Sequence, residues 1–240
     1  MIELNNIDVS FNEKKLFDSL NLNINDGEFV VLVGDNGAGK STLLNLIAGN
    51  VRPDSGQILF DGTDVTKLST DRRAKYIGRV FQDPKVGTCA DMTILENISL
   101  YLNKGHNFDL RRGLTHQREF FKEFELDLDE RLHTSVSTLN GGQRQVLSLI
   151  MATFCQPPIL LLDEHTAALD PATSNLVMKQ TAKLVAKFPK MITIMVTHNM
   201  KMALDYGDRL LFFKNGKIRI DAGQKNKSEI TLQDLASMYE

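Results

Sequence analysis

A glycine-rich segment directly after a continuous apolar run constrains the fold of this chain more than any other feature. The apolar run, residues 29–33, suits a strand buried on both faces, and residues 42–48 have the apolar spacing of a helix. Between them, GDNGAGKST at residues 34–42 matches the pattern G-x-x-x-x-G-K-[ST]. The order of strand, glycine-rich loop and helix predicts an α/β fold that binds a nucleoside triphosphate.

The residue types of this loop suit phosphate binding. Glycines let the backbone curl so that its amide groups point at phosphate oxygens, and the helix start adds its positive end. We expect Lys40 to reach the outer phosphates and the Ser41 hydroxyl to bind Mg²⁺. The alternative, an ordinary glycine turn that matches by chance, is disfavoured by the strand and helix on either side. The expected nucleotide-binding residues are Gly34, Asn36, Gly37, Ala38, Gly39, Lys40, Ser41 and Thr42.

Two adjacent carboxylates end a second buried strand. The apolar residues 159–162 are followed directly by Asp163 and Glu164. A magnesium and phosphate site needs negative charge at the carboxyl edge of a sheet. We expect Asp163 to hold Mg²⁺, and Glu164 to orient or deprotonate the water that attacks the terminal phosphate. Two acids in this position can equally cap a helix or lie in a solvated loop, so the phosphate loop is what favours the catalytic interpretation.

A second anion-binding segment has the sequence LNGGQRQ at residues 139–145 and opens a helix expected from Gln143 to Ala152. Its glycine amides and the helix start favour a phosphate. The chain therefore has two phosphate-binding ends, and a single nucleotide seldom needs both from the same protomer.

Strand signals outside these motifs indicate a mixed sheet. Alternating apolar residues near the amino terminus predict antiparallel strands, and residues 57–60 and 76–81 predict two more. A strand at 191–196 follows a helix expected at 171–187, and residues 210–220 are typical of a hairpin. We expect a core with a mixed sheet flanked by helices, preceded by an amino-terminal antiparallel β subdomain.

A helical insertion is expected within this core. Residues 93–138 have apolar residues at helical spacing and no clear strand. We therefore expect one domain over residues 1–240, with the core at 1–81 and 156–240 and the helical subdomain at about 82–155. Within that subdomain Arg111, Arg112, Arg118 and Lys122 alternate with glutamates, which favours a solvated helix face. Phe120, Phe121 and Phe124 either receive a membrane subunit or belong to the subdomain core.

Composition narrows the classes of function. With 42% hydrophobic and 24% charged residues, the 240-residue chain can bury a core, and its net charge of -2 gives no basic field for nucleic acid. Cys89 and Cys155 lie far apart without metal-ligand spacing, which is typical of a reducing compartment. No apolar run approaches the roughly 20 residues that cross a bilayer, and no secretion signal is evident. We expect a cytoplasmic protein whose membrane association is peripheral.

Together these segments resemble the ATP-binding cassette (ABC) ATPases over essentially the whole chain, with the motifs in the family's order. Residues 139–143 resemble the family signature L-S-G-G-Q, which in that family completes the ATP site of the opposite protomer. The resemblance implies an α/β P-loop NTPase core, ATP and Mg²⁺ as cofactors, and a homodimer or pseudo-dimer with ATP at its interface. The residues expected to contact the partner's nucleotide are Asn140, Gly141, Gly142 and Gln143.

The resemblance also assigns roles to single residues. Phe11 stands where the family has an aromatic that stacks on adenine; the alternative is a core aromatic. Gln82 matches the glutamine that contacts magnesium and the attacking water and at which the helical subdomain hinges; the alternative is a surface glutamine. His198 matches the histidine that contacts the terminal phosphate, although a histidine after a strand is often structural. Residues 168–170 resemble the loop that passes signals between protomers.

The chain departs from the family pattern at two positions. Asn140 replaces the serine whose hydroxyl contacts the terminal phosphate, so its longer amide must reproduce or forgo that contact. His165 follows Glu164 where the family more often has proline or alanine, and the sequence offers no physical account of its imidazole.

The favoured function is the ATPase subunit of an ABC transporter. ATP closes the dimer, closure moves separate membrane subunits docked near Gln82, and hydrolysis reopens it. The resemblance implies a stand-alone cassette on the inner face of the cell membrane, with permease subunits and an extracytoplasmic substrate-binding protein, and favours import over export. Residues 163–171 resemble a branch associated with amino-acid-type importers, particularly of tryptophan- or tyrosine-like cargo.

Two alternative functions belong to other classes of protein. A non-transport cassette would act as a nucleotide-switched module on ribosomes, DNA or the division apparatus, but such proteins usually have paired cassettes or inserted coiled coils. A small-molecule kinase would share the phosphate loop but leaves residues 139–143 and His198 without a role. No nucleic-acid partner is expected.

Overall fold

The computed structural model describes residues 1–12, 14–102 and 130–239. The chain packs as two compact units. The first unit comprises Met1–Gly78, Pro157–Glu164 and Val185–Glu240, and the second comprises Arg79–Gln156 and His165–Leu184. The basic cluster and the three phenylalanines expected between residues 111 and 124 lie outside the described residues.

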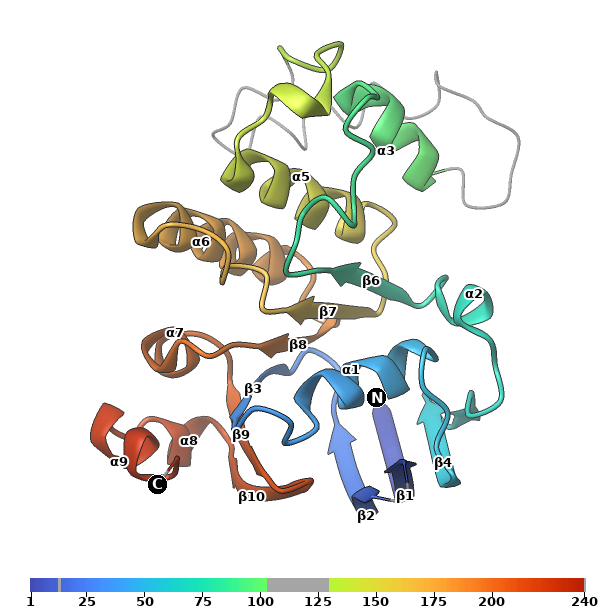
Figure 1. Cartoon of the computed structure of the whole chain (residues 1–240), viewed down its shortest axis with the longest axis vertical. Helices are drawn as coiled ribbons and strands as arrows, with labels where there is room; N and C mark the ends of the chain where they lie inside the picture. Colours follow the sequence, from blue (N-terminus) through green and yellow to red (C-terminus); the bar gives the residue numbers. More distant parts are fainter. Residues whose placement is uncertain (13, 103–129, 240) are drawn as a thin grey trace. The chain divides into compact units, whose positions relative to one another are not determined.

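An antiparallel sheet opens the first unit. Its strands are β1 (Ile2–Phe11), β2 (Lys14–Ile24), β4 (Ser55–Phe60) and β5 (Thr63–Asp64), in the order β2-β1-β4-β5 (Figure 1). Ile2 and Leu4, and after a register shift Ile7 and Val9, are the buried residues of β1, and Leu4 lies opposite both Leu22 and Ile58. One face of the sheet therefore joins the core, which is what the period-two pattern predicts.

A six-stranded mixed sheet follows. Its strands are β3 (Phe29–Gly34), β6 (Ile77–Val80), β7 (Ile159–Asp163), β8 (Ile192–Val196), β9 (Arg209–Lys214) and β10 (Lys217–Ala222), in the order β10-β9-β3-β8-β7-β6. Strand β3 pairs in parallel with β8 and β9, β7 pairs in parallel with β8, and β10 pairs antiparallel with β9. The predicted mixed sheet is confirmed.

Parallel register aligns the ends of the central strands. Asp163, the last residue of β7, lies opposite Val196, the last residue of β8. Every residue of β3 and β8 is buried, because neighbours cover both faces of a parallel sheet. Residues that follow β7 and β8 therefore emerge at one edge.

The first unit carries the helices α1 (Lys40–Ala48), α2 (Thr70–Arg73), α7 (Met200–Asp205), α8 (Gln224–Lys227) and α9 (Leu232–Ser237). Helix α1 packs on β3, β7 and β8 (Figure 1). Its last turn is held by Arg73, a fully buried residue whose guanidinium donates to the carbonyls of Leu46 and Ile47. A cation suits this end because the helix dipole is negative there.

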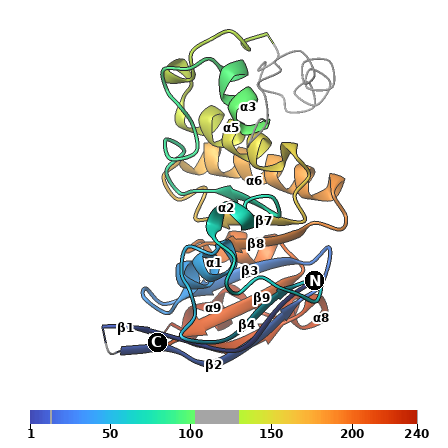
Figure 2. The same cartoon turned by 90° about the vertical axis from the view of Figure 1, so that its right-hand side faces the viewer.

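The second unit is helical. It contains α3 (Ile94–Leu102), the 3₁₀ turn η1 (Val136–Thr138), α5 (Gly141–Phe154) and most of α6 (Pro171–Lys187), and α3 packs against α5 (Figure 2). Helix α5 is longer than the predicted 143–152, because Asn140 and Gln143 form a capping box that starts it at Gly141. In the described parts of both units, no helix has the length and apolarity needed to cross a membrane.

Candidate functional site

The predicted phosphate loop connects β3 to α1. Gly34, Gly37 and Gly39 have φ of 139°, 76° and 108°, the left-handed region that favours glycine. A Cβ added to Gly34 would lie 1.9 Å from the carbonyl oxygen of Phe213, and one added to Gly39 would lie 2.5 Å from the Phe17 ring. At Gly37 a Cβ would meet nothing within 4 Å, so this side of the loop is open.

The start of α1 fits an anion. Its N-cap is Gly39, so no side chain caps the helix, and its first turn contains no acidic residue. The first N–H groups of a helix have no intrahelical partner, and the dipole is positive at that end. Together with the open side of the loop, these groups form a cradle suited to phosphate oxygens.

Lys40 is folded onto the loop. Its side chain is 5% exposed, and Nζ donates to the carbonyl oxygens of Gly34 at 2.6 Å and Asp35 at 2.8 Å. Burial lowers the pKa of Lys40, while the charges of Glu164 and Asp35 act in the opposite direction. The ammonium thus has backbone partners that a phosphate can replace.

Asp163 and Ser41 supply a hard oxygen pair. Asp163 ends β7, and its Oδ1 lies 3.5 Å from the Ser41 Oγ. A carboxylate and a hydroxyl suit Mg²⁺, which keeps several waters and commonly binds through one or two protein ligands and substrate phosphates. Over the described ranges, no group of three or more histidine, cysteine, aspartate or glutamate side chains could hold a metal ion. The pair fits an ion that arrives with a nucleotide.

Glu164 and His198 meet at the same edge. The His198 Nε2 lies 2.7 Å from the Glu164 Oε1, and the Glu164 N–H donates to the Val196 carbonyl at 3.0 Å. Glu164 has φ of 48°, a conformation uncommon for a residue other than glycine. Uncommon backbone conformations concentrate at functional sites because the surrounding structure must enforce them.

One pocket brings together eight of the predicted residues of the first unit, without Phe11, Gly34, Ala38 or Asp163 in its lining. It measures about 150 Å³. It is lined by Asn36, Gly37, Gly39, Lys40, Ser41, Thr42, Glu164 and His198. Phe11 lies at the end of β1 and is 47% exposed, which excludes the alternative of a core aromatic. Its predicted contact with adenine stays a prediction.

The predicted signature segment lies in the second unit. Asn140 Oδ1 accepts the Gln143 N–H at 2.9 Å, and Gln143 Oε1 accepts the Asn140 N–H at 3.2 Å. The Asn140 amide is therefore engaged in capping α5. A Cβ on Gly142 would lie 2.2 Å from the Thr173 methyl group, so Gly142 is required for packing. Gln82 is exposed in the loop after β6.

Two further predicted residues of this unit have local partners. Asp170, in the segment expected to signal between protomers, caps α6 by accepting the N–H groups of Ala172 and Thr173 at 3.1 Å. His165 is 1% exposed, and its Nε2 lies 3.1 Å from the Thr181 Oγ1. The imidazole that the sequence left unexplained thus ties the segment after Glu164 to α6.

Sequence reasoning missed Tyr239. Its hydroxyl accepts the N–H of Gly34 at 3.0 Å, so the end of the described chain contacts the first residue of the phosphate loop. The Tyr239 ring packs edge-on against Phe212, with centroids 5.1 Å apart. No pattern in the sequence signals a contact between positions 205 residues apart.

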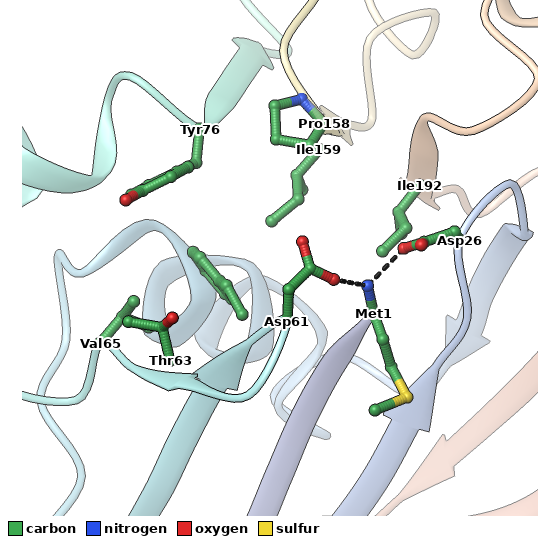
Figure 3. A pocket seen from close by; sticks show the side chains of 10 residues that line it. Met1, Asp26, Asp61, Thr63, Val65, Tyr76, Pro158, Ile159 and Ile192 are labelled. Atoms are coloured by element: carbon green, nitrogen blue, oxygen red, sulfur yellow. Dashed lines mark hydrogen bonds and ion pairs between the residues drawn. The ribbon is translucent and has the colours of Figure 1, made fainter.

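A second pocket, of about 140 Å³, opens at the opposite edge of the mixed sheet (Figure 3). Ile159 and Ile192, the first residues of β7 and β8, line it together with Tyr76. The amino group of Met1 pairs there with Asp26 and Asp61. None of the predicted site residues is among those that line this pocket.

Comparison with known proteins agrees with this geometry. The family model described as ABC transporter matches residues 17–167. A solved dimeric ATP-binding cassette in a post-hydrolysis state, bound to ADP and Pi, is 30% identical with a TM-score of 0.77, over 93% of this chain and 99% of that one. An ABC transporter cassette in its ADP conformation is 25% identical with a TM-score of 0.83, over 100% and 99%.

Curated relatives are import and transport subunits. The tyrosine transport ATP-binding protein of Clostridioides difficile (strain R20291) is 45% identical over 100% of this chain and 99% of that protein. The osmoprotectant import ATP-binding protein OsmV of Salmonella typhimurium (strain LT2) is 33% identical, and the match covers 91% of this chain but only 57% of that protein. The match to the family model and the match to the Clostridioides difficile protein over nearly its whole length show that the chain belongs to the ABC transporter family.

Proposed function

We propose that this chain is the ATP-hydrolysing subunit of an ABC importer, with an aromatic amino acid of the tyrosine type as cargo. The observation that carries the catalytic part is the pocket in which the phosphate loop, Lys40, Glu164 and His198 meet. The cargo rests on the relative whose printed name is a tyrosine transport protein and which matches along its whole length.

Nucleotide binding uses the loop and the start of α1. Backbone N–H groups of residues 36–42 receive the phosphates, and Phe11, exposed at the end of β1, offers a flat face to the adenine. Lys40 exchanges its hydrogen bonds to the Gly34 and Asp35 carbonyls for phosphate oxygens. That exchange favours the nucleotide because an ammonium gains more from a phosphate than from neutral carbonyls.

Ser41 and Asp163 are the residues that would hold Mg²⁺, and Gln82 stays the predicted third ligand. When bound, the ion neutralises charge that develops on the phosphate oxygens. Glu164 orients the attacking water and accepts its proton, because it lines the pocket and directly follows Asp163. His198 contacts Glu164 through its Nε2, and in this mechanism the same nitrogen turns toward the terminal phosphate.

In the dimer, the signature segment of one protomer supplies a second phosphate-binding segment to the ATP site of the other. Asn140, Gly141, Gly142 and Gln143 of one protomer face the nucleotide of the other. Two solved structures of one relative are dimeric cassettes, which supports this arrangement. The proposed partners are integral membrane permease subunits and an extracytoplasmic substrate-binding protein, and the proposed location is the inner face of the cell membrane.

Size-exclusion chromatography of Glu164→Gln, with and without ATP and Mg²⁺, tests the shared site. Loss of the proton acceptor leaves binding intact and stalls hydrolysis, so ATP is expected to convert monomer to dimer. Gly142→Asp is a poor control because its side chain would strike Thr173. Gly141→Asp is better, since its nearest neighbour is the flexible end of Leu169 at 3.2 Å.

Reconstitution tests the cargo. The chain is co-purified with its membrane partners and placed in vesicles with labelled tyrosine, using Lys40→Ala as the matched inactive control. ATP-dependent uptake of tyrosine is expected in vesicles with the unaltered chain and not in vesicles with Lys40→Ala. Co-purification with ribosomes in place of membrane proteins would overturn the transport function.

A further inference from the structure

Gln145 is a buried amide that joins two predicted site segments of the second unit. Its side chain is 0% exposed on α5, two residues after Gln143. Its Nε2 donates to the carbonyl oxygen of Phe81 at 3.0 Å. Phe81 directly precedes Gln82, so one hydrogen bond connects the helix that begins at the signature segment to the loop that contains Gln82.

The other half of this amide lacks a partner. Among the described residues, Gln145 Oε1 is buried and accepts no hydrogen bond. The orientation of the amide follows from its neighbour, because only the NH₂ group can donate to the Phe81 carbonyl. Buried polar atoms are nearly always satisfied in folded proteins, and a buried acceptor without a donor is costly. The Nε2 bond to the Phe81 carbonyl accounts for one half of the amide, and the buried Oε1 is left available for a further donor.

We propose that Gln145 is a positioning residue for ATP hydrolysis, and that its free Oε1 accepts a backbone N–H of residues 81–83 when nucleotide is bound. The inference rests on the proposed function. The Nε2 bond holds the Gln82 loop in the observed arrangement, and in the proposal the Oε1 bond holds it after Gln82 moves. The amide thereby transmits movement of the Gln82 loop to the start of α5, where residues 140–143 contact the partner's nucleotide.

The chain offers a matched control for a buried amide. Gln180, on α6, is 4% exposed, and its Oε1 is likewise buried without a partner among the described residues. Gln145→Met and Gln180→Met remove the same atoms from similarly buried positions. Of the two, only Gln145 bonds to the Phe81 carbonyl. An effect on the Gln82 loop that occurs in Gln145→Met but not in Gln180→Met is therefore not caused by a general loss of stability.

Hydrogen exchange with a non-hydrolysable ATP analogue and Mg²⁺ is the decisive measurement. In the unaltered chain and in Gln180→Met, the amides of residues 81–83 are expected to gain at least tenfold protection on binding. In Gln145→Met this gain is expected to disappear while residues 34–42 remain protected. An equal gain in Gln145→Met, or no gain at 81–83 in the unaltered chain, overturns the inference. No protection at 34–42 in any protein refutes the proposed function, and the inference with it.

A double-mutant cycle gives a second readout. If Gln145 acts through Gln82, Gln145→Met is expected to lower kcat at least fivefold and to change the KM for ATP less than twofold. Adding Gln145→Met to Gln82→Ala is then expected to cause no further loss, because coupled residues are not additive. Full additivity, or an equal loss in Gln180→Met, contradicts the positioning role. The rates are measured in the assembled transporter.

Discussion

The His198 Nε2 lies 2.7 Å from the Glu164 Oε1, within hydrogen-bond reach. The register that places Asp163 opposite Val196 brings the two residues together, because each follows its strand by one or two positions. The histidine therefore contacts the proposed proton acceptor directly. Nucleotide binding must exchange this contact for one to phosphate or water.

Substitutions of His198 should test its role as a hydrogen-bond donor to the terminal phosphate apart from its contact with Glu164. His198→Ala is expected to lower kcat on the order of 10²-fold, because removing one preorganised donor to developing charge costs about that much. His198→Gln keeps an N–H donor and is expected to retain more activity. Phosphate release under saturating ATP measures both. Equal losses in the two variants would show that the imidazole contributes more than a hydrogen-bond donor.

Lys40→Met should lower the affinity for ATP without lowering the thermal stability of the chain. The Lys40 ammonium is buried against two backbone carbonyls, and burying a charge is costly even when it is hydrogen-bonded. The variant is expected to melt no lower than the unaltered chain, while its affinity for ATP falls at least tenfold. Thermal melting and titration with a fluorescent ATP analogue measure the two effects. Lys179→Met, an exposed change on α6, is the control for loss of a positive charge.

Arg73 should stabilise the last turn of α1, and with it the folded chain. It is 0% exposed and donates to the carbonyls of Leu46, Ile47 and Thr66. Arg73→Ala leaves a cavity and unpaired buried carbonyls, so we expect the free energy of unfolding to fall by about 2–4 kcal/mol.

Urea unfolding measures this loss, and the neighbouring Arg72→Ala is the control. Arg72 is exposed, so its removal is expected to change the free energy of unfolding by less than about 0.5 kcal/mol. Equal unfolding midpoints for the two variants would show that Arg73 does not anchor α1.

His165 should make the nucleotide-free chain sensitive to acid. Burial lowers the pKa of His165 to about 4, whereas a histidine in an unfolded chain titrates near about 6.5. Between these values the unfolded chain binds the proton and the folded chain does not. The free energy of unfolding therefore falls as the pH drops from about 6.5 to about 4, by about 3 kcal/mol in total, and this contribution vanishes above that range.

Chemical unfolding at several pH values, without nucleotide or Mg²⁺, measures the slope. His165→Gln is expected to flatten it while lowering stability at neutral pH, because the contact with Thr181 is weakened. His133→Gln, at an exposed position, serves as the control. An unchanged slope in His165→Gln would assign the acid sensitivity to other groups.

Local patterns were sufficient to predict most of the fold. The period-two pattern of β1, the apolar runs of β3, β7 and β8, and the glycine-rich loop before α1 each predict their element from adjacent residues. Those strands also predict that Glu164 and His198 lie at one edge. Their 2.7 Å contact could not be predicted, because it depends on strand register and on side-chain rotamers.

Contacts between distant positions escaped prediction for a physical reason. The bond from Gln145 to Phe81 spans 64 residues, and no periodicity relates the two positions. The capping role of Asn140 was local and could have been recognised, since an asparagine three residues before a glutamine is a helix-start pattern. Its resemblance to a serine that contacts phosphate directed attention to the ligand instead.

Tyr239→Phe should weaken nucleotide binding from outside the pocket. The Tyr239 hydroxyl accepts the Gly34 N–H at 3.0 Å, while the ring packs on Phe212 and would stay in place as phenylalanine. Loss of one hydrogen bond to a half-buried group costs about 1 kcal/mol, and it loosens the first residue of the phosphate loop. We expect the KM for ATP to rise two- to fivefold with little change in kcat, because Glu164 is untouched. Tyr206→Phe is the control, and an unchanged KM in Tyr239→Phe would show that β3 alone holds the loop.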